Sequence, residues 1–522
     1  MDPETRSCQN CKKDFVIESD DFAFYERIQV ALPTLCPECR RIRRMTWRND
    51  FTFYNRTCDA TGEPIISLYA PKKHRVVYAT RYWWSDVWDP MDYGRDFDFT
   101  RPFFEQFHEL QKVVPLPALM NDDGVGSVNC RYTQNEAYAK NSYMVSMAWK
   151  NEDCMYSYGV SGPQAIEVVD SMDIFQSERI YESIFLNQSY DCTFCYYGAT
   201  LVSSHFCLDC RNLQNCFMCV GIRDKSYCFK NEQYSKEEYL KILESYQLHT
   251  YSGQKRAKEE FELFQQTFPE REPYMINCVD SIGDGILNSK NAKYVYTARR
   301  CHNVKYFENG NDITDGYDML VGGENELCYE GITPDNDRLA LFSIFSYKNN
   351  DVTYVEHCFS STDLFGCSGL RHKQYCILNK QYTKEEYLVL KAKIIEHMKQ
   401  TGEWGEFFPS KYSHFGYNET IAQDNYPLSK TEAEEQGLPW FNDIQMTKGK
   451  ETISLDTTSD NIRSIHDDIT EEILACESTG RNYRITDQEL QFYRKMNLPI
   501  PRKCFFERHK ERLTKRQKRI FI

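Results

Sequence analysis

The stretch CVGIRDKSYCFKNEQYSKEEYL, residues 219–240, has a close copy in CSGLRHKQYCILNKQYTKEEYL, residues 367–388. Aligned without gaps at an offset of 148, the two stretches share 14 of 22 positions. Similarity at a fixed offset is the sequence signature of a repeated structural unit, here of about 150 residues. The middle of the chain therefore predicts a duplicated unit.

Each copy is itself made of shorter segments that resemble one another. Short segments rich in Cys, Tyr, Phe and Val, such as YDCTFC, HFCLDC and NCFMC, are separated by Asn, Asp, Gly and Ser. This pattern predicts a mainly β fold with some α structure, built as a duplicated β-solenoid of the parallel β-helix kind. We expect about 20–24 residues per coil with two strands per coil, and a sandwich or barrel is the alternative.

A helix is expected at the end of each copy. Ser235 with Glu238, and Thr383 with Glu386, form capping boxes, in which the hydroxyl and the carboxylate satisfy backbone N–H groups at a helix start. Apolar residues follow at helical spacing. We predict that these helices cover the solenoid and block its open edges.

A second repeat links the two ends of the chain at an offset of 468. Cys8 corresponds to Cys476 and Cys36 to Cys504, with matching aromatic residues between them. A small module is therefore predicted near both termini. In the N-terminal copy, the pairs Cys8-x2-Cys11 and Cys36-x2-Cys39 have the spacing of a tetrahedral Zn²⁺ site with four thiolates. Such a closed site is structural, and the alternative is four unrelated cysteines.

This segment resembles a zinc-ribbon family of treble-clef type found in bacterial proteins. The residues that carry the resemblance are Cys8, Cys11, Phe15, Phe24-Tyr25, Pro33, Cys36, Cys39 and Arg40. More broadly, the chain is similar to multi-zinc-ribbon proteins of candidate-phyla bacteria, through WWSDVWDPMDYGRDFDF (83–99), RPFFEQF (101–107), NEQYSKEEY (231–239), FGYNETIAQ (415–423) and FYRKMNLPIPRKC (492–504). The resemblance implies a structural Zn²⁺ and no particular activity.

The C-terminal copy departs from this pattern because Thr479 and Glu507 stand where Cys11 and Cys39 would be. Only Cys476 and Cys504 remain, which predicts a degenerate ribbon without metal. The alternative is an irregular second metal site completed by Glu507 or His509. The phrase beginning at Cys58 echoes the one at Cys476, so a third degenerate ribbon is possible in residues 55–90.

Two further C-x2-C pairs lie in the first copy of the repeat: Cys192, Cys195, Cys207 and Cys210. At the offset of 148, the first three correspond to Ala340, Ser343 and Val355. Small or apolar substitutes favour a packed cysteine ladder in the core, and a second zinc site is the alternative.

Aromatic residues are dense between Tyr82 and Phe107, where they alternate with carboxylates and arginine. This composition favours the packed core of a linking domain. The alternative is a sugar-binding groove lined by tryptophan and carboxylates.

Basic residues gather after the last cysteine position of each terminal module. They are Arg40, Arg41, Arg43, Arg44, Arg48, Lys510, Arg512, Lys515, Arg516, Lys518 and Arg519. The last 21 residues hold nine Lys/Arg against two Glu, a charge of +7 in a chain of −14. Local positive charge suits phosphate contact, so we expect nucleic acid or a ribosome as a partner. The alternatives are a solvated helix face or an arm docked on the acidic body.

Composition bounds the remaining possibilities. The chain has 522 residues, 22 cysteines and 14% aromatic residues, with no apolar stretch long enough for a spanning helix. Its start does not read as a secretory signal, so we expect a cytoplasmic protein whose cysteines stay reduced. P-loop, G-x-S-x-G, H-E-x-x-H and G-x-G-x-x-G motifs are absent from the sequence.

The predicted organisation has six segments. They are a zinc ribbon (1–52), an aromatic-rich linking domain (53–118), two β-solenoid units (119–270 and 271–400), a connector (401–470) and a degenerate ribbon with a basic tail (471–522). The favoured function is a non-enzymatic interaction or scaffold protein, with a protein partner also possible, and no membrane or small-molecule substrate is expected. The alternative is a β-helix enzyme that acts on a polysaccharide through paired carboxylates on the solenoid face.

Overall fold

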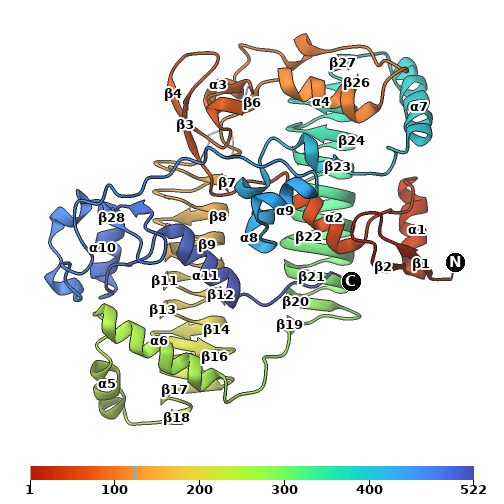
Figure 1. Cartoon of the computed structure of the whole chain (residues 1–522). Coiled ribbons are helices and arrows are strands. Elements are labelled where there is room, and N and C mark those ends of the chain that lie inside the picture. The colour runs from red at the N-terminus through yellow and green to blue at the C-terminus, as the bar shows by residue number, and fades with distance from the viewer. Residues whose placement is uncertain (1, 74, 122–125, 522) are drawn as a thin grey trace. The chain divides into compact units, whose positions relative to one another are not determined.

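The computed structural model describes residues 2–73, 75–121 and 126–521 (Figure 1). It contains two compact units, each assembled from segments that are distant in the sequence. Unit 1 comprises residues 1–123, 273–443 and 518–522, and unit 2 comprises residues 124–272 and 444–517. The N-terminal module and the aromatic-rich segment therefore belong with the second repeat, and the C-terminal module belongs with the first.

Each unit is built on one large, mostly parallel sheet. The unit 2 sheet contains β7 (Gln134–Ala137), β8 (Ser146–Glu152), β9 (Tyr158–Val169), β10 (Met172–Phe175), β11 (Glu178–Tyr181), β12 (Ile184–Asn187), β13 (Tyr190–Thr193), β14 (Tyr196–Val202), β15 (His205–Leu208), β16 (Arg211–Val220), β17 (Arg223–Phe229) and β18 (Glu232–Gln233). The unit 1 sheet contains β19 (Met275–Ile276), β20 (Ile282–Leu287), β21 (Lys290–Arg299), β22 (His302–Asp335), β23 (Arg338–Tyr347), β24 (Asn350–Glu356), β25 (Thr362–Ser368), β26 (Gln374–Ile377) and β27 (Lys380–Gln381). The prediction of a mainly β chain with some helices is confirmed.

Strand pairing in both sheets advances by 12 residues at most steps. Arg338 pairs with Asn350, for example, and Asn350 pairs with Thr362. The backbone takes a left-handed conformation at every third residue, as at Phe342 (φ 57°) and Phe345 (φ 48°). Four such bends therefore occur within each step. This register step is shorter than the 20–24 residues per coil that we expected, because the bends come at every third residue and not only between pairs of strands.

The interior of each sheet is lined by residues that also follow at steps of three. In unit 2, Cys207, Cys210 and Leu213 follow at this spacing and are fully buried in one apolar cluster. In unit 1 an equivalent cluster contains Val304 and Phe307, among others. The side chains between two bends thus point into one continuous core in each unit, which is what a tripeptide pattern of burial requires.

Helices follow both sheets where the capping boxes predict them. The helices are α5 (Lys236–Ser245) and α7 (Lys384–Thr401), each after a short antiparallel strand pair. Tyr239 and Tyr387, at equivalent positions in the first turn, are both fully buried. These tyrosines anchor the helices to the ends of their sheets. In unit 2 a further helix, α6 (Tyr251–Gln265), packs its Phe261 edge-on against Phe206 of the sheet.

The aromatic-rich segment packs as core within unit 1. It contains β5 (Val77–Tyr78), α3 (Thr80–Trp83), α4 (Phe103–Val113) and β6 (Leu116–Pro117). Trp83 and Phe103 are fully buried, and Phe103 lies 5.0 Å from Tyr354 of the unit 1 sheet, measured between ring centroids. The segment therefore covers one face of that sheet, in agreement with the packing interpretation and not with a sugar-binding groove.

Three hairpins carry the same cysteine turn. The hairpins are β1–β2 (Glu4–Ser7, Asp14–Ile17), β3–β4 (Tyr54–Thr57, Pro64–Ser67) and β28–β29 (Leu474–Ala475, Asn482–Tyr483). In each turn the cysteine N–H donates to the carbonyl five residues ahead: Cys8 to Lys13, Cys58 to Glu63 and Cys476 to Arg481, at 2.8–2.9 Å. The Cys58 turn therefore repeats the hairpin of the two terminal modules, and a third degenerate ribbon in residues 55–90 stays a prediction.

The two terminal modules share one element order. The N-terminal module continues with α1 (Ser19–Ile28) and α2 (Pro37–Met45), and the C-terminal module with α10 (Asp487–Lys495) and α11 (Phe505–Lys515). Both pairs of helices begin at positions related by the offset of the sequence repeat. In the chain between α7 and the C-terminal module lie the short helices α8 (Ile421–Asn425) and α9 (Lys430–Glu435), the latter capped by Ser429 as expected. Among the described residues, no helix combines the length and apolarity needed to cross a bilayer.

Candidate metal centre

Four cysteine sulfurs converge in the N-terminal module. The ligand atoms of Cys8, Cys11, Cys36 and Cys39, here called the four-cysteine cluster, all lie within 4.8 Å of one another. Cys11 Sγ is 3.8 Å from Cys36 Sγ. A tetrahedral zinc ion with Zn–S bonds of about 2.3 Å separates its sulfurs by about 3.8 Å. The four side chains could therefore hold a metal ion, as their spacing predicts.

Local backbone structure positions both pairs. Cys8 and Cys11 lie in the β1–β2 turn, where Lys12 takes a left-handed conformation (φ 63°). Cys36 is the N-cap of α2, and Cys39 lies in its first turn. The Cys36 N–H donates to Cys8 Sγ at 3.3 Å. Such N–H donors and the positive end of a helix dipole favour thiolates, the form that binds metal.

The cluster is mostly shielded from solvent. Cys8, Cys36 and Cys39 are buried and Cys11 is exposed. A hydrogen bond from the Cys39 thiol lowers the pKa of Cys36 to about 5. Asn10 Nδ2 donates to Cys39 Sγ at 3.4 Å, a contact that favours the thiolate form of Cys39. All four coordination positions would be filled by sulfur, so the site can organise structure and offers no open position for a substrate.

The C-terminal module keeps only half of this set. Within the described parts of the chain, no group of three or more Cys, His, Asp or Glu side chains besides the four-cysteine cluster comes close enough to hold an ion. Cys476 and Cys504 are buried near Ser478 and Thr479. Burial raises the pKa of Cys476, but hydrogen bonds from Ser478 and Thr479 outweigh it and lower that pKa to about 7. The predicted irregular second metal site is thus left with two thiols, which supports a degenerate ribbon.

The four cysteines of the repeat lie in the packed core of unit 2. Cys192, Cys195, Cys207 and Cys210 are at most 1% exposed. Cys195 Sγ lies 3.4 Å from the carbonyl of Thr193 and 3.3 Å from that of Ser204. Burial raises the pKa of Cys195 and of Cys207 well above the ordinary thiol value. These thiols behave as small hydrophobes that donate to backbone carbonyls, which favours the ladder interpretation over a zinc site.

The basic residues after Cys39 form ion pairs with carboxylates of unit 1. Arg40 and Arg44 both reach Asp318, at 2.9 and 3.1 Å, and Arg44 reaches Glu330 at 3.0 Å. Arg43 also pairs with Glu330, at 2.7 Å. The guanidinium groups face the sheet and not the solvent.

The remaining arginines of this run are equally enclosed. Arg41 pairs with Glu308, and Arg48 lies 3.0 Å from Asp50. Arg40, Arg41, Arg44 and Arg48 are each at most 4% exposed. The charges of these four residues neutralise buried carboxylates, which supports the alternative of an arm docked on the acidic body. Nucleic-acid contact at these residues stays a prediction.

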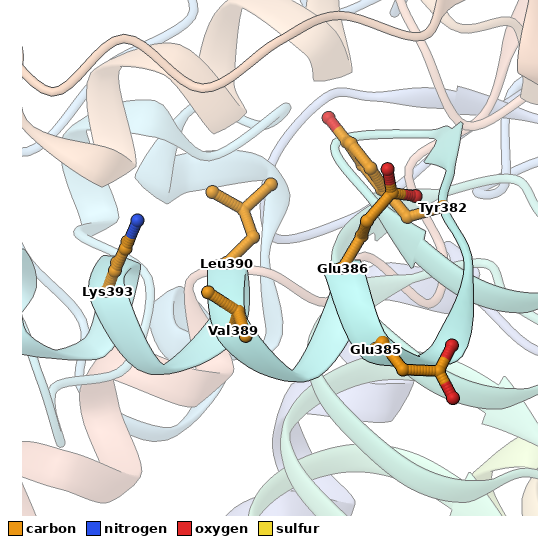
Figure 2. Close-up of a pocket in the computed structure, with 6 residues that line it drawn as sticks. All are labelled: Tyr382, Glu385, Glu386, Val389, Leu390 and Lys393. Atoms are coloured by element: carbon orange, nitrogen blue, oxygen red, sulfur yellow. The ribbon is translucent and has the colours of Figure 1, made fainter.

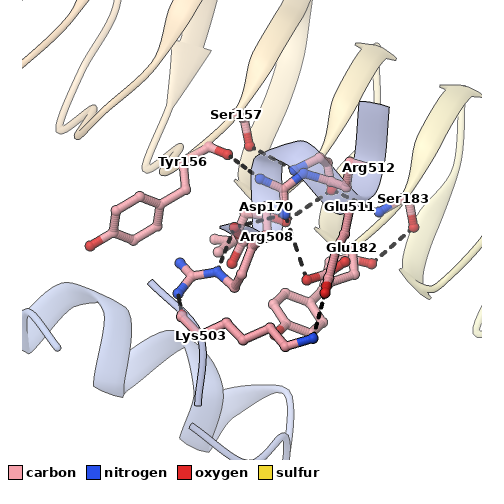
Figure 3. A network of polar contacts seen from close by, with 12 residues as sticks. Tyr156, Ser157, Asp170, Glu182, Ser183, Lys503, Arg508, Glu511 and Arg512 are labelled. Carbon is pink, nitrogen blue, oxygen red and sulfur yellow. Dashed lines mark hydrogen bonds and ion pairs between the residues drawn. The ribbon is translucent and has the colours of Figure 1, made fainter. Parts of the chain in front are cut away.

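The C-terminal basic run divides between buried and exposed residues. Arg512 is buried and lies 3.0 Å from Asp170 (Figure 3), and Arg519 is buried beside Glu308 of unit 1. Arg516 is half-buried, while Lys510, Lys515 and Lys518 are exposed. Arg512 and Arg519 are therefore paired with carboxylates of the chain itself, and nucleic-acid contact stays a prediction for the C-terminal run.

A buried histidine–carboxylate group in unit 1 has no sequence signature. His414 Nε2 donates to Glu356 Oε1 at 2.6 Å, and Gln111 Nε2 donates to Glu356 Oε2 at 3.1 Å. His357 lies next to Glu356 and is 2% exposed, and among the described residues neither of its ring nitrogens has a hydrogen-bond partner. The members come from α4, from the end of β24 and from the segment after α7, so no spacing rule could have joined them.

This group predicts acid sensitivity of unit 1. Burial lowers the pKa of His357 to about 4, below the ordinary value of about 6.5. The unfolded chain then binds more protons than the folded one, so stability is present above pH 6.5 and declines as the pH falls towards 4. We expect His357→Phe to remove about 2–3 kcal/mol of that decline.

Urea unfolding followed by tryptophan fluorescence at pH 7 and pH 4.5 measures this difference. The matched control is His302→Phe at an exposed position, which should leave the pH dependence unchanged. An equal pH dependence in His357→Phe and the parent protein would show that His357 is not the responsible group.

One surface hollow lies beside α7 (Figure 2). It has a volume of about 410 Å³ and is lined by Tyr382, Glu385, Glu386, Val389, Leu390 and Lys393. The side chains drawn in Figure 2 project from one helix and the segment before it. Glu386 is already committed to the capping box with Thr383.

Comparisons with known proteins add no family. No family model matches this chain, and no curated protein does so. A solved structure of a candidate acetyltransferase from Desulfovibrio desulfuricans G20 shares 10% identity, with a TM-score of 0.10. The match covers 48% of this chain and 59% of that one. At this score the likeness carries no argument about fold or activity.

Proposed function

We propose that this protein is a zinc-stabilised, non-catalytic scaffold. Zinc bound at the four-cysteine cluster would fix the start of α2, and α2 in turn holds the N-terminal module on its sheet. The observation that carries the proposal is this continuity: Cys36 and Cys39 begin the helix whose next residues, Arg40 and Arg44, pair with buried carboxylates. A structural ion at that position stabilises a tertiary contact and not a reaction.

Zinc fits the donor set better than other common metals. Four thiolates at tetrahedral spacing are typical of structural zinc, whereas magnesium and calcium prefer oxygen ligands. The exposed Cys11 gives the ion a route to the site. The chemistry that the ion would supply is charge neutralisation and cross-linking of the β1–β2 turn to α2.

We interpret the regular strand register, with its bend at every third residue, as a β-solenoid in each unit. Repeat folds of this kind present extended surfaces and are widely used for binding. The exposed corners of the unit 1 sheet carry polar ladders, for example Asn291 to Asn303 to Asp315, joined by side-chain hydrogen bonds at 3.1 and 2.8 Å. Such regular polar surfaces support a role in holding a partner.

The polysaccharide-enzyme alternative receives less support. Paired carboxylates do occur one register step apart on the sheets, as in Asp318 and Glu330. Both are fully buried and paired with arginine. A general acid and a general base need access to substrate and a proton to exchange, and these two groups have neither.

The first test measures metal and polyanion binding on the same purified chain. We expect one zinc per chain by mass spectrometry of the metal, and elution of the protein from immobilised RNA at physiological salt. The matched control is the chain with Cys36→Ser and Cys39→Ser, which should carry no zinc. A metal-free parent that unfolds at the same temperature as the zinc form would overturn the scaffold proposal. Retention on RNA that weakens with salt would instead favour the nucleic-acid partner.

A further inference from the structure

The two terminal modules bind their sheets through the same contact. Arg40 Nε donates to Asp318 at 3.0 Å, and Arg508 Nε donates to Asp170 at 3.0 Å. The two arginines are related by the offset of 468 and the two aspartates by the offset of 148, which are the offsets of the two sequence repeats. The terminal modules form one sequence repeat and the sheets form the other. In each unit, the equivalent arginine of the module contacts the equivalent aspartate of the sheet.

The second arginine of each helix extends the correspondence. Arg44 bridges Asp318 and Glu330 in unit 1, and Arg512 bridges Asp170 and Glu182 in unit 2 (Figure 3). The carboxylates of each pair lie one register step of 12 residues apart, and neighbouring strands of a sheet are about 4.8 Å apart. Arginines four positions apart on a helix are separated by a similar distance, since the pitch is about 5.4 Å. The spacing of the helix thus matches the spacing of the sheet.

Aromatic contacts repeat with closely related offsets. Arg40 lies over the Tyr306 ring at 5.4 Å, and Arg508 lies over the Tyr156 ring at 5.0 Å. The next pairs are Tyr25 with Tyr329 at 5.5 Å and Tyr493 with Tyr181 at 5.8 Å, both edge-on. The same recognition surface, a tyrosine followed by an aspartate and a glutamate, is built once in each sheet.

We propose that this surface is a binding site for the arginine-bearing helix of a terminal module, α2 or α11. We also propose that other residues make each module bind its own sheet and not the other sheet. The shared contacts supply binding. They cannot supply selection, because both modules and both sheets carry them. Selection must come from contacts that one unit has and the other lacks.

Two buried ion pairs of unit 1 are candidates for this selection. Arg41 pairs with Glu308, and Asp21 pairs with Lys305. All four side chains are at most 5% exposed. In the C-terminal module, the residues that correspond to Asp21 and Arg41 are Glu489 and His509.

The sheet positions that correspond to Glu308 and Lys305 follow from a bulge in unit 2. Trp149 pairs with Ser161 at the usual step, but Asn151 pairs with Ala165, two positions beyond the usual step. The unit 2 sheet therefore gains two residues here, and the offset upstream is 150, as the equivalent tyrosines 306 and 156 also require.

At this offset the unit 2 sheet carries Tyr158 and Met155 in place of Glu308 and Lys305. Placed on that sheet, Arg41 and Asp21 would be buried without these partners of opposite charge. A buried charge that loses its partner is strongly unfavourable, so these two pairs would reject the wrong sheet. This inference concerns assembly and does not depend on which ion occupies the four-cysteine cluster.

The proposal is tested by exchanging the four residues of the two selective ion pairs for their unit 2 counterparts in the full-length protein. The sheet variant is Lys305→Met with Glu308→Tyr, the module variant is Asp21→Glu with Arg41→His, and the third chain carries all four changes. Because Glu308 also pairs with Arg519, every chain, including the reference, carries Arg519→Gln. Hydrogen exchange of the α2 amides, resolved by mass spectrometry, is the readout, and the α11 amides of unit 2 are the internal reference.

We expect exchange at α2 to rise about tenfold or more in the sheet variant and in the module variant, and to return to within about threefold of the reference in the four-fold variant. Exchange at α11 should not change. The proposal that these ion pairs select the sheet would be overturned by either of two results. One is that exchange at α2 stays high in the four-fold variant, and the other is that it is unchanged in both two-fold variants. If the sheet variant loses protection in β23 as well, the module variant decides alone. Zinc content measured on each chain separates these outcomes from failure of the metal proposal.

Discussion

Replacing Cys8 with serine is expected to abolish metal binding and to lower the unfolding midpoint of unit 1 by roughly 10 °C or more. The fully buried Cys8 sulfur is one of the four that converge, and its loss leaves three thiolates and an incomplete tetrahedron. Without a bound ion, the β1–β2 turn would lose the cross-link that a metal at the cluster would make to the start of α2. Metal analysis and differential scanning calorimetry measure the two effects.

The chain contains its own control for this prediction. Cys476 is the counterpart of Cys8 at the offset of 468 and is also buried, in a turn with the same hydrogen bond. We expect Cys476→Ser to leave the zinc content unchanged and to shift the midpoint only slightly. Loss of zinc in Cys476→Ser, or its retention in Cys8→Ser, would contradict the assignment of the metal to the N-terminal module alone.

Replacing Asp318 with alanine is expected to lower the unfolding free energy of unit 1 by about 3–5 kcal/mol. Asp318 is fully buried and pairs with both Arg40 and Arg44, so its removal takes a counter-charge from two guanidinium groups in the interior. Burying a charge without its partner costs far more than a surface pair contributes. Urea unfolding, with hydrogen exchange to assign the transition to unit 1, gives the value.

Asp312 provides a matched control within the same strand. It has the same left-handed backbone conformation as Asp318, with φ of 57° at both residues, and it pairs with Arg300 at the surface. We expect Asp312→Ala to change the unfolding free energy by at most about 1 kcal/mol. Similar losses in the two variants would show that backbone strain, and not the buried ion pair, dominates at Asp318.

The local chemistry of this fold could be predicted from the sequence. The spacing of Cys8, Cys11, Cys36 and Cys39 is sufficient for the cluster, because metal ligands must meet at fixed distances whatever the rest of the chain does. Ser235 and Thr383 mark their helices because a capping box is satisfied within four residues. Duplication is visible at 148 and 468 because copied residues need no structural interpretation.

The register and the pairing of distant segments could not be predicted. The step between paired strands depends on a left-handed bend at every third residue, and the residues at these bends include Phe, Tyr and Lys, which favour no such conformation by themselves. From the sequence alone, Arg40 would be interpreted as a solvated charge, because its partner Asp318 lies 278 residues later. Likewise, nothing in the sequence brings His357, Glu356 and His414 into one buried group.

The order in which the chain is synthesised gives the docking contacts a timing. Arg40 leaves the ribosome 278 residues before Asp318, which at usual elongation rates is roughly 15–55 s. Through that interval the N-terminal module exists without its sheet, so its arginines are unneutralised while the other repeat is being made. The C-terminal module meets the opposite situation, because Asp170 precedes Arg508 by 338 residues and its sheet is already complete. The Arg40–Asp318 contact is therefore completed when the unit 1 sheet is synthesised, after its helix. The Arg508–Asp170 contact is completed when α11 is synthesised, after its sheet.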